Sequence, residues 1–174
     1  MQEYGEPGRL DVGNREWTPG EHGGPSFTTE TAHVDVVNRQ PGRHRLRIFV
    51  GGSRTITARA VIDSQIKALP GSAIVLTSRT HGASAAIRDA AIQRGLQLEV
   101  WTAFTDRYLT AEDAYFARDE EMIQSADRVL AFWDGESAGT SHELAYATKL
   151  AKPIGVVLVN RGLSPDRFPG GDAA

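Results

Sequence analysis

The chain contains 174 residues, with 19 Lys and Arg against 22 Asp and Glu, which gives a formal net charge of −3. Because domains typically contain about 100–150 residues, this length predicts one domain and excludes a second full one. The sequence contains no cysteine, which excludes a disulfide scaffold, thiolate zinc sites and a cysteine nucleophile. The negative charge gives no overall positive field for a phosphate backbone, so we expect no nucleic-acid polymer as a partner.

The sequence also bears on cellular location. No apolar stretch approaches the roughly 18 residues typical of a membrane span, and residues 1–6 lack the basic-then-apolar order of a signal peptide. The absence of cysteine agrees with a reducing compartment. We therefore expect a cytoplasmic protein without a membrane partner.

Residues 1–44 are interrupted by glycine and proline and show no sustained apolar period. Such a segment buries too little apolar surface to offset its loss of conformational entropy, so it is predicted to form a flexible N-terminal arm. The partial alternation of residues 32–37 indicates one short strand, on a sheet edge or on a partner subunit. Residues 161–174 are predicted to form a C-terminal tail.

From residue 45 onward, short apolar runs alternate with amphipathic stretches of helix length, which is typical of a parallel sheet with crossover helices. The predicted strands are 46–50, 73–77, 96–102, 128–132 and 154–159. The predicted helices are 58–69, 83–94, 110–125 and 141–150. Because such crossovers are almost always right-handed, residues 45–160 predict an α/β, Rossmann-like, doubly wound fold with a mainly parallel sheet of about five strands and helices on both faces.

Ligands of such a sheet bind beyond the carboxyl ends of its strands, so the loops that follow the strands hold the candidate site residues. The first of these loops reads Gly51-Gly52-Ser53-Arg54. Its two glycines allow the backbone to approach a ligand closely, while Ser53 and Arg54 offer an oxygen and a cation. The loop is neither a dinucleotide fingerprint nor a Walker loop, so it is either a phosphate or ribose contact or an ordinary strand-to-helix turn.

The loop after the second predicted strand is polar and ends at a helix N-terminus, where anions bind well. Arg79 and Gly82 are its better candidates for such a contact. His81 alone is weak support, because a histidine in a loop is more often solvated than catalytic.

The loop after the fourth predicted strand is rich in glycine and hydroxyl groups and opens directly into a helix. Free N–H groups at Gly139, Thr140 and Ser141 would favour a phosphate monoester. Glu143 would then lie in the first helical turn, either beside the ligand or as the partner of Thr140 in a capping box. Trp133 either stacks on a base or covers the sheet edge.

The third predicted helix carries Arg118-Asp119-Glu120-Glu121-Met122. At helical spacing, Arg118 and Met122 share a face while Glu121 points elsewhere. The acidic run is most simply a solvated face, and Arg118 alternatively reaches over the carboxyl edge of the sheet.

Four segments recur here in a fixed order: Gly51-Gly52-Ser53-Arg54, 118–122, 126–135 and Ser137-x-Gly139-Thr140. Together they resemble the YspA-related branch of the SLOG superfamily. The resemblance extends from about residue 45 to residue 159 and implies a Rossmann-like fold. It also implies a nucleotide-derived ligand, which many members of the superfamily bind without turning it over.

The same positions are similar to two groups of enzymes that act on N-glycosidic bonds. In Lonely Guy phosphoribohydrolases a Gly-Thr-x-x-Glu motif holds the phosphate and supplies a catalytic glutamate, and the matching residues here are Gly139, Thr140 and Glu143. A helix with the motif Arg-x-x-x-Met supplies an arginine in those enzymes, and the matching residue here is Arg118. In nucleoside 2-deoxyribosyltransferases and related N-glycosidases the glutamate attacks the anomeric carbon. This chain departs from the phosphoribohydrolases at residues 136–138, where Glu136 could repel an anion.

The resemblance therefore implies hydrolysis or transfer at the N-glycosidic bond of a nucleoside 5′-monophosphate or a nucleoside, with Glu143 and Arg118 as catalytic residues and Trp133 stacking on the base. The alternative is a non-catalytic sensor of a nucleotide-derived ligand. We expect a homo-oligomer and neither a metal nor a cofactor. The expected phosphate- and ribose-binding residues are Gly51, Gly52, Ser53, Arg54, Arg79, Gly82, Asp119, Ser137, Gly139 and Thr140.

Overall fold

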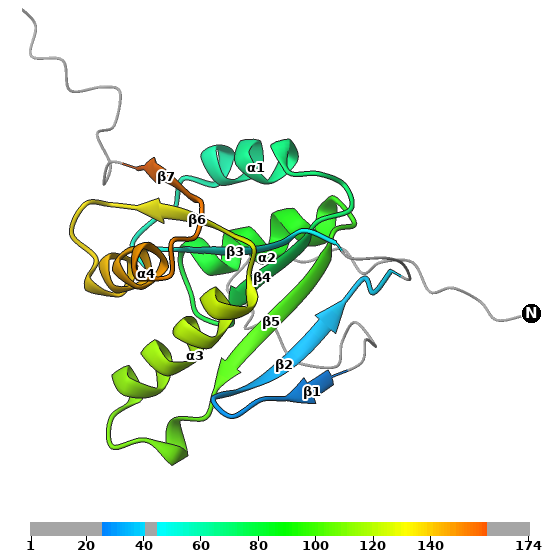
Figure 1. Cartoon of the computed structure of the whole chain (residues 1–174). Helices are drawn as coiled ribbons and strands as arrows, with labels where there is room; N and C mark the ends of the chain where they lie inside the picture. Colours follow the sequence, from blue (N-terminus) through cyan, green and yellow to red (C-terminus); the bar gives the residue numbers. More distant parts are fainter. Residues whose placement is uncertain (1–25, 41–44, 160–174) are drawn as a thin grey trace, which may run out of the picture.

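Parallel strands make up most of the sheet in the computed structural model, which describes residues 26–40 and 45–159 (Figure 1). The strands are β1 (Ser26–Thr28), β2 (Ala32–Val37), β3 (Arg47–Gly52), β4 (Ile74–Ser78), β5 (Gln97–Ala103), β6 (Arg128–Trp133) and β7 (Ile154–Leu158). The helices are α1 (Arg59–Ala68), α2 (Ala83–Gln93), α3 (Ala111–Ser125) and α4 (Ala138–Lys149), and the 3₁₀ helix η1 (Thr105–Arg107) precedes α3. The predicted Rossmann-like α/β fold is confirmed, with seven described strands in place of about five.

The two additional strands come from the segment predicted as an arm. β2 occupies the residues for which a short strand was expected and pairs antiparallel with β5 in the sheet. β1, which pairs antiparallel with β2, has only three residues and so is too short to show a period in the sequence. The rest of the predicted arm before residue 26 and the predicted tail 161–174 lie outside the described residues.

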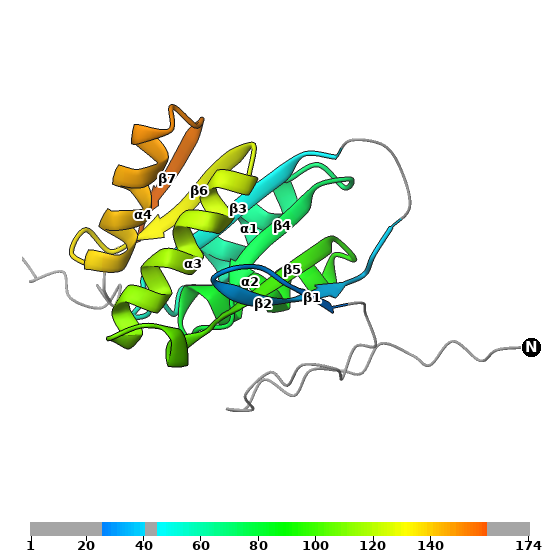
Figure 2. The ribbon, with the colours of Figure 1, turned by 60° about the horizontal axis from the view of Figure 1, so that its bottom comes forward.

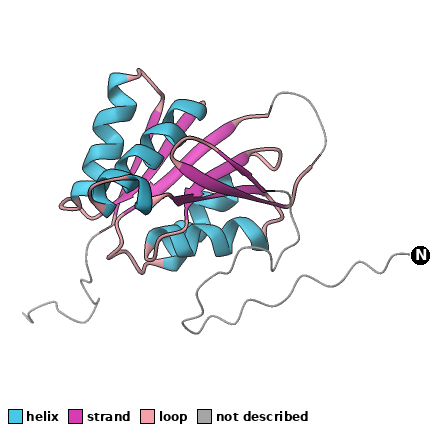
Figure 3. Cartoon of the chain, turned by 90° about the horizontal axis from the view of Figure 1, so that it is seen from below, coloured by secondary structure: helices cyan, strands magenta, loops and turns pink. Residues whose placement is uncertain are grey.

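Helices cover both faces of the sheet (Figures 2 and 3). α1 and α2 pack on one face around Ile62, Ile66 and Ile87, and α3 and α4 pack on the other around Met122 and Ala147. β4 is buried along its whole length. Because both faces are covered, the central strands are continuous apolar runs rather than alternating ones. Within residues 26–40 and 45–159, every helix is too short or too polar to cross a lipid bilayer.

The strand order β1-β2-β5-β4-β3-β6-β7 places a topological switch point between β3 and β6. The chain builds β4 and β5 on one side of β3 and then crosses to build β6 and β7 on the other side. The carboxyl ends of β3 and β6 are neighbours, with Gly52 paired to Phe132. In open parallel sheets a crevice for ligands forms at such a point.

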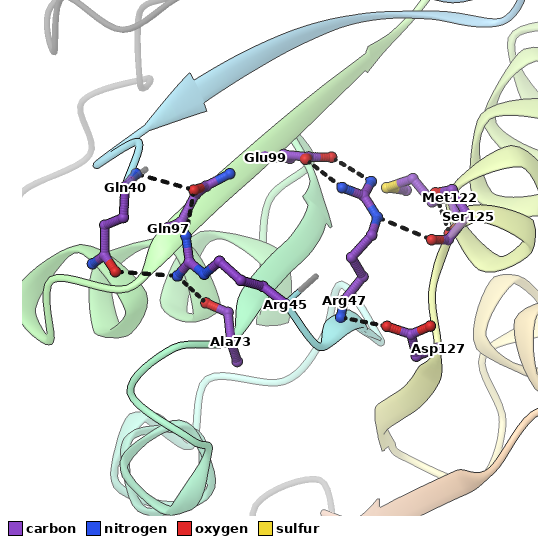
Figure 4. Close-up of polar contacts among 9 residues, drawn as sticks. All are labelled: Gln40, Arg45, Arg47, Ala73, Gln97, Glu99, Met122, Ser125 and Asp127. Carbon is purple, nitrogen blue, oxygen red and sulfur yellow. Dashed lines mark hydrogen bonds and ion pairs between the residues drawn. The ribbon is translucent and has the colours of Figure 1, made fainter. Parts of the chain in front are cut away.

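Polar contacts fix the opposite, amino ends of the central strands (Figure 4). The guanidinium group of Arg47 donates to both carboxylate oxygens of the buried Glu99, at 2.8 Å each. Gln97 Oε1 accepts from Arg45 Nη1 at 2.6 Å and from the backbone N–H of Gln40 at 3.2 Å. Bidentate arginine–carboxylate contacts are among the stronger polar interactions, so they hold this end of the sheet firmly. The carboxyl ends of the strands, which carry the candidate site residues, lie at the opposite end of the sheet.

A carboxylate of α3 accepts hydrogen bonds from the turn between β1 and β2 and holds it in place. Glu121 Oε2 accepts from Thr29 Oγ1 at 3.0 Å, from the backbone N–H of Thr31 at 3.3 Å and from Thr31 Oγ1. The expectation that this acidic run is a solvated face is therefore wrong for Glu121. The segments that meet here are about 90 residues apart in the sequence, so helical spacing alone could not identify the partner.

Replacing Glu121 with alanine is expected to destabilise the protein by about 1–2 kcal/mol, because it removes the acceptor of three hydrogen bonds. Thermal unfolding measures the change, with about 2–4 °C of Tm expected for each kcal/mol. Glu120→Ala is the matched control, because Glu120 makes an ion pair with His142 in which both side chains are about one-third exposed. Equal losses in the two variants would contradict the assigned role of Glu121.

Candidate functional site

A cavity of about 460 Å³ lies at the carboxyl ends of β3, β4 and β6, between α3 and the N-terminus of α4. This volume is within the range of about 300–1,000 Å³ typical of small-molecule sites. Eight of the residues predicted for the site line the cavity: Gly52, Arg54, Arg118, Asp119, Ser137, Gly139, Thr140 and Glu143. The structure thus brings together residues from three separate segments of the sequence.

Five predicted residues do not line this cavity: Gly51, Ser53, Arg79, Gly82 and Trp133. Ser53 is buried and its hydroxyl group donates to Asp134 Oδ1 at 3.0 Å, so it links two loops below the cavity surface. The indole Nε1 of Trp133 donates to the carbonyl oxygen of Ser137 at 3.3 Å and holds the loop before α4. These side chains support the site, and the structure offers no stacking surface at Trp133 inside the cavity.

Helix α4 begins three residues earlier than the capping box predicts. Ser137 is the N-cap, and its hydroxyl oxygen accepts from the backbone N–H of Thr140 at 3.5 Å. The Ser137 carbonyl oxygen accepts the N–H of Ser141 at 3.0 Å. The prediction of free N–H groups at Thr140 and Ser141 is therefore wrong, as is the capping box, and Glu143 lies in the second turn of the helix.

Glu143 extends from α4 onto the backbone of β3. A Cβ atom added to Gly51 would lie 2.7 Å from Phe49 Cζ and 2.8 Å from Glu143 Oε2, so a side chain at this position would force the ring or the carboxyl group to move. The residue is 8% exposed, and its Oε2 atom has no hydrogen-bond partner among the described residues. Burial raises the pKa of Glu143 well above its usual value, and the nearby Asp119 raises it further while Arg118 opposes both.

Arg118 and Asp119 form a buried ion pair beside Glu143. Arg118 Nε and Nη2 lie 2.9 Å and 2.8 Å from Asp119 Oδ1. Burial raises the pKa of Asp119, and the guanidinium group of Arg118 counteracts this effect. Asp119 is thus not part of a solvated face, and Arg118 reaches the carboxyl edge of the sheet as the alternative interpretation expected.

Tyr115 joins the two arginines of the cavity. The guanidinium carbons of Arg54 and Arg118 each lie 5.3 Å from the centre of the Tyr115 ring, within the range of a cation–π interaction. Tyr115 precedes Arg118 by three residues, so helical spacing could have placed it on the same side of α3. It was missed because the charged segment 118–122, which drew attention to this helix, begins at Arg118 and does not include Tyr115.

Seven further lining residues were not predicted: Thr55, Ser78, Thr80, Ser84, Glu112, Phe116 and Asp134. Ser78 Oγ is 2.6 Å from Thr80 Oγ1 and 3.0 Å from Ser84 Oγ, which gives one wall of the cavity a connected set of hydroxyl groups. Arg88 Nη1 donates to the carbonyl oxygens of Ser78 and Thr80 at 2.6 Å and 2.9 Å. Burial lowers the pKa of Arg88 to about 10, so the group remains a cation that fixes this wall.

The cavity therefore combines buried carboxyl groups, two arginines and hydroxyl groups. Among the residues that the structure describes, no three His, Asp or Glu side chains are grouped so that they could hold a metal ion. The chemistry available from these side chains is proton transfer, electrostatic stabilisation and nucleophilic attack by a carboxylate.

The sequence matches no family model and no curated protein. A similar solved structure is that of DNA processing protein A from Helicobacter pylori, which is described as having a unique single-stranded DNA binding mode. The two chains share 15% sequence identity with a TM-score of 0.54, and the match covers 71% of each chain. The similarity is one of fold.

This similarity overturns the expectation that no nucleic-acid polymer is a partner, because a protein of the same fold is described as binding single-stranded DNA. The expectation was based on the net charge of −3. Net charge does not report how charges are distributed, and a local group of arginines can attract phosphates on a protein that is negative overall. The exclusion was therefore wrong as an argument from composition.

Proposed function

We propose that the cavity binds a nucleoside, with or without a 5′-phosphate, and that the protein hydrolyses its N-glycosidic bond or transfers its sugar. The observation that carries this proposal is the carboxyl group of Glu143, which is buried at the cavity against Gly51 with Oε2 unpartnered among the described residues. Burying a polar group without a hydrogen-bond partner lowers the stability of the folded protein. A carboxyl group in such a position is therefore better explained by a function than by a contribution to stability.

The proposed chemistry uses the ionised form of Glu143. As the bond between C1′ and the base nitrogen breaks, its electron pair leaves with the base, which takes up a proton, and positive charge builds at C1′. The carboxylate stabilises this charge or forms an ester with C1′, and water then supplies the hydroxyl group of the released sugar. Arg118 holds Asp119 in place beside Glu143.

The assignment to the SLOG superfamily remains a proposal that rests on the ordered motifs of the sequence. A ligand sensor of the SLOG type would use the same cavity without the chemistry of Glu143. The two functions differ in one observable: an enzyme releases free base, whereas a sensor binds its ligand unchanged.

Incubation with a panel of nucleosides and nucleoside 5′-monophosphates, followed by chromatography of the free bases, tests the proposal. Base release by the wild-type protein is expected, together with a loss of about a thousandfold or more in Glu143→Ala. Glu112→Ala, which removes an exposed carboxylate at the same cavity, is the control and should retain far more activity than Glu143→Ala. Saturable binding without base release would support the sensor instead.

Binding of single-stranded DNA is a second candidate function. It is supported by the fold shared with DNA processing protein A and by the exposed residue Arg54 at the cavity. Fluorescence anisotropy of a labelled oligothymidylate should then increase with protein, and the affinity should fall as salt rises because phosphate contacts release counterions. An anisotropy that does not change at low salt would contradict this candidate.

A further inference from the structure

Three hydroxyl groups on one wall of the cavity form a hydrogen-bonded chain. Ser78 Oγ donates to Ser84 Oγ at 3.0 Å and lies 2.6 Å from Thr80 Oγ1. A hydroxyl group has a single proton to donate. Because Ser78 donates its proton to Ser84, it must accept the proton of Thr80. The chain of donors therefore leads from Thr80 through Ser78 to Ser84.

The hydroxyl group of Ser84, at the end of this chain, has a proton without an acceptor. Among the residues that the structure describes, the Oγ atom of Ser84 takes part in one hydrogen bond, the one that it accepts from Ser78. Ser84 is 3% exposed and lines the cavity. A buried donor without an acceptor lowers stability, and an acceptor atom on a bound ligand would remove that cost. The cavity therefore offers a buried O–H donor to its ligand.

Arg88 fixes this wall from behind. Its Nη1 atom donates to the carbonyl oxygens of Ser78 and Thr80, and the residue is buried. Burial lowers the pKa of Arg88 to about 10, so the guanidinium group stays positively charged at neutral pH. Hydrogen bonds in a connected set polarise one another, which strengthens the donor at its end. A donor that is held in place in this way favours a ligand atom on which negative charge develops.

The wall and the start of α4 lie on opposite sides of β3. β3 pairs on one side with β4, which leads into α2 with Ser84, and on the other side with β6, which leads into α4. Glu143 reaches the backbone of β3 at Gly51, between the two. A nucleoside with its C1′ atom at Glu143 therefore extends toward both sides. The sugar fits the side of α4, where an added Cβ at Gly139 would have open space around it, and the base then lies beside the hydroxyl wall.

We infer that Ser84 donates a hydrogen bond to a ring nitrogen or carbonyl oxygen of the leaving base. The inference rests on the proposed function and assigns the residue that stabilises its leaving group. When the bond between C1′ and the base nitrogen breaks, the electron pair passes to the base, and the O–H of Ser84 stabilises the negative charge that builds there. The proton stays on Ser84. The base takes up a proton of the water molecule that supplies the hydroxyl group of the released sugar.

The first measurement is kcat/KM for base release from adenosine, guanosine, uridine and their 5′-monophosphates. Ser84→Ala is expected to lower kcat/KM by about a hundredfold, because a donor aimed at developing charge is lost. Thr77→Val is the matched control and should change kcat/KM by less than about twofold. The Oγ1 atom of Thr77 is also buried without a partner among the described residues, but Thr77 does not line the cavity.

A substrate with a different leaving group separates this role from a structural one. The base of 7-methylguanosine carries a positive charge and departs as a neutral molecule, so it needs little stabilisation by a donor. Ser84→Ala should therefore lower kcat/KM for 7-methylguanosine by less than about threefold while it lowers that for guanosine by about a hundredfold. A general loss of structure would slow both substrates equally.

The outcomes distinguish this inference from the proposed function. Equal kcat/KM values for Ser84→Ala and Thr77→Val, or equal losses for guanosine and 7-methylguanosine, would overturn this inference and leave the proposed function intact. Base release from none of the substrates by the wild-type protein would overturn the proposed function, and this inference with it. If Ser84→Ala fails to fold, as judged by circular dichroism, Ser84→Cys decides, because a thiol is close in size and only a weak donor.

Discussion

Glu143→Gln is expected to stabilise the protein by about 1–2 kcal/mol near neutral pH while it abolishes base release. Near neutral pH the carboxyl group has lost its proton in the unfolded chain, whereas burial favours the protonated form in the folded state, and this difference lowers the stability of the wild-type protein. The amide of glutamine does not ionise and so removes this cost. Thermal unfolding should show a Tm raised by about 2–4 °C for each kcal/mol. Active sites commonly exchange stability for function in this way.

The pH dependence of the same variant provides the sharper test. Burial raises the pKa of Glu143 well above its ordinary value of 4.5. Between that value and the raised pKa, the folded state keeps a proton that the unfolded state has lost, so stability falls as the pH rises. The contribution of Glu143 to the free energy of unfolding is therefore greatest below the ordinary pKa and is lost as the pH rises to the raised pKa. Glu143→Gln should remove this part of the decline.

Glu112→Gln is the control for these measurements, because Glu112 is an exposed carboxylate of the same cavity. Its free energy of unfolding should change by no more than about 0.5 kcal/mol. A lower Tm for Glu143→Gln across the whole pH range would contradict the account, since it would mean that the carboxylate stabilises the fold through a charge or hydrogen bond.

The elements that could be predicted from the sequence are those whose pattern is local. β4 is a continuous apolar run because helices cover both faces of the sheet, and α1 repeats Ile62 and Ile66 at helical spacing. The handedness of crossovers then makes a doubly wound sheet the expected arrangement, although it does not fix which strands are neighbours. β1 could not be predicted, because three residues hold no period and its position depends on pairing with β2.

The first residue of α4 could not be predicted from the sequence, for a different reason. Ser137 and Thr140 are both good N-cap residues, and the glutamate three residues after Thr140 favours the later start. The structure selects Ser137, because Asp134 already binds the backbone N–H of that residue and fixes the turn before the helix. Local sequence could not decide between them, since the loop is also held by Ser53, which lies 81 residues before Asp134.

Site residues in the loops that follow strands could be predicted from the sequence. Site residues were missed where the fold brings distant segments together at the cavity. Arg54, Arg118 and Glu143 were found from loop position and motif, and all three line the cavity. Asp134 follows β6 in a loop that was already singled out, but its role depends on hydroxyl groups of the β3–α1 loop. The strand order brings these distant segments together, and no pattern in the sequence near Asp134 indicates that they meet.

Gly82→Ala is expected to cost about 3 kcal/mol or more, although Gly82 was predicted only as a ligand contact. Its φ of +69° and ψ of −130° lie in a region that is essentially restricted to glycine, where strain costs about 1–3 kcal/mol. An added Cβ atom would also lie 2.1 Å from the carbonyl oxygen of Arg54, which is backbone and cannot rotate away. Chemical denaturation should reveal the loss as a lower midpoint at unchanged slope.

Substitutions at two other glycines distinguish the two causes of the lost stability, which are backbone strain and the steric clash of the added Cβ atom. Gly95 has the same φ of +69° but nothing within 4 Å of an added Cβ, so Gly95→Ala should cost only about 1 kcal/mol. Gly71 has equal space without a positive φ, so Gly71→Ala should be close to neutral. Equal losses at Gly82 and Gly95 would show that the loop carrying Arg54 moves aside without cost. The expected order instead means that Gly82 sets the distance between the N-terminus of α2 and the loop that places Arg54 in the cavity.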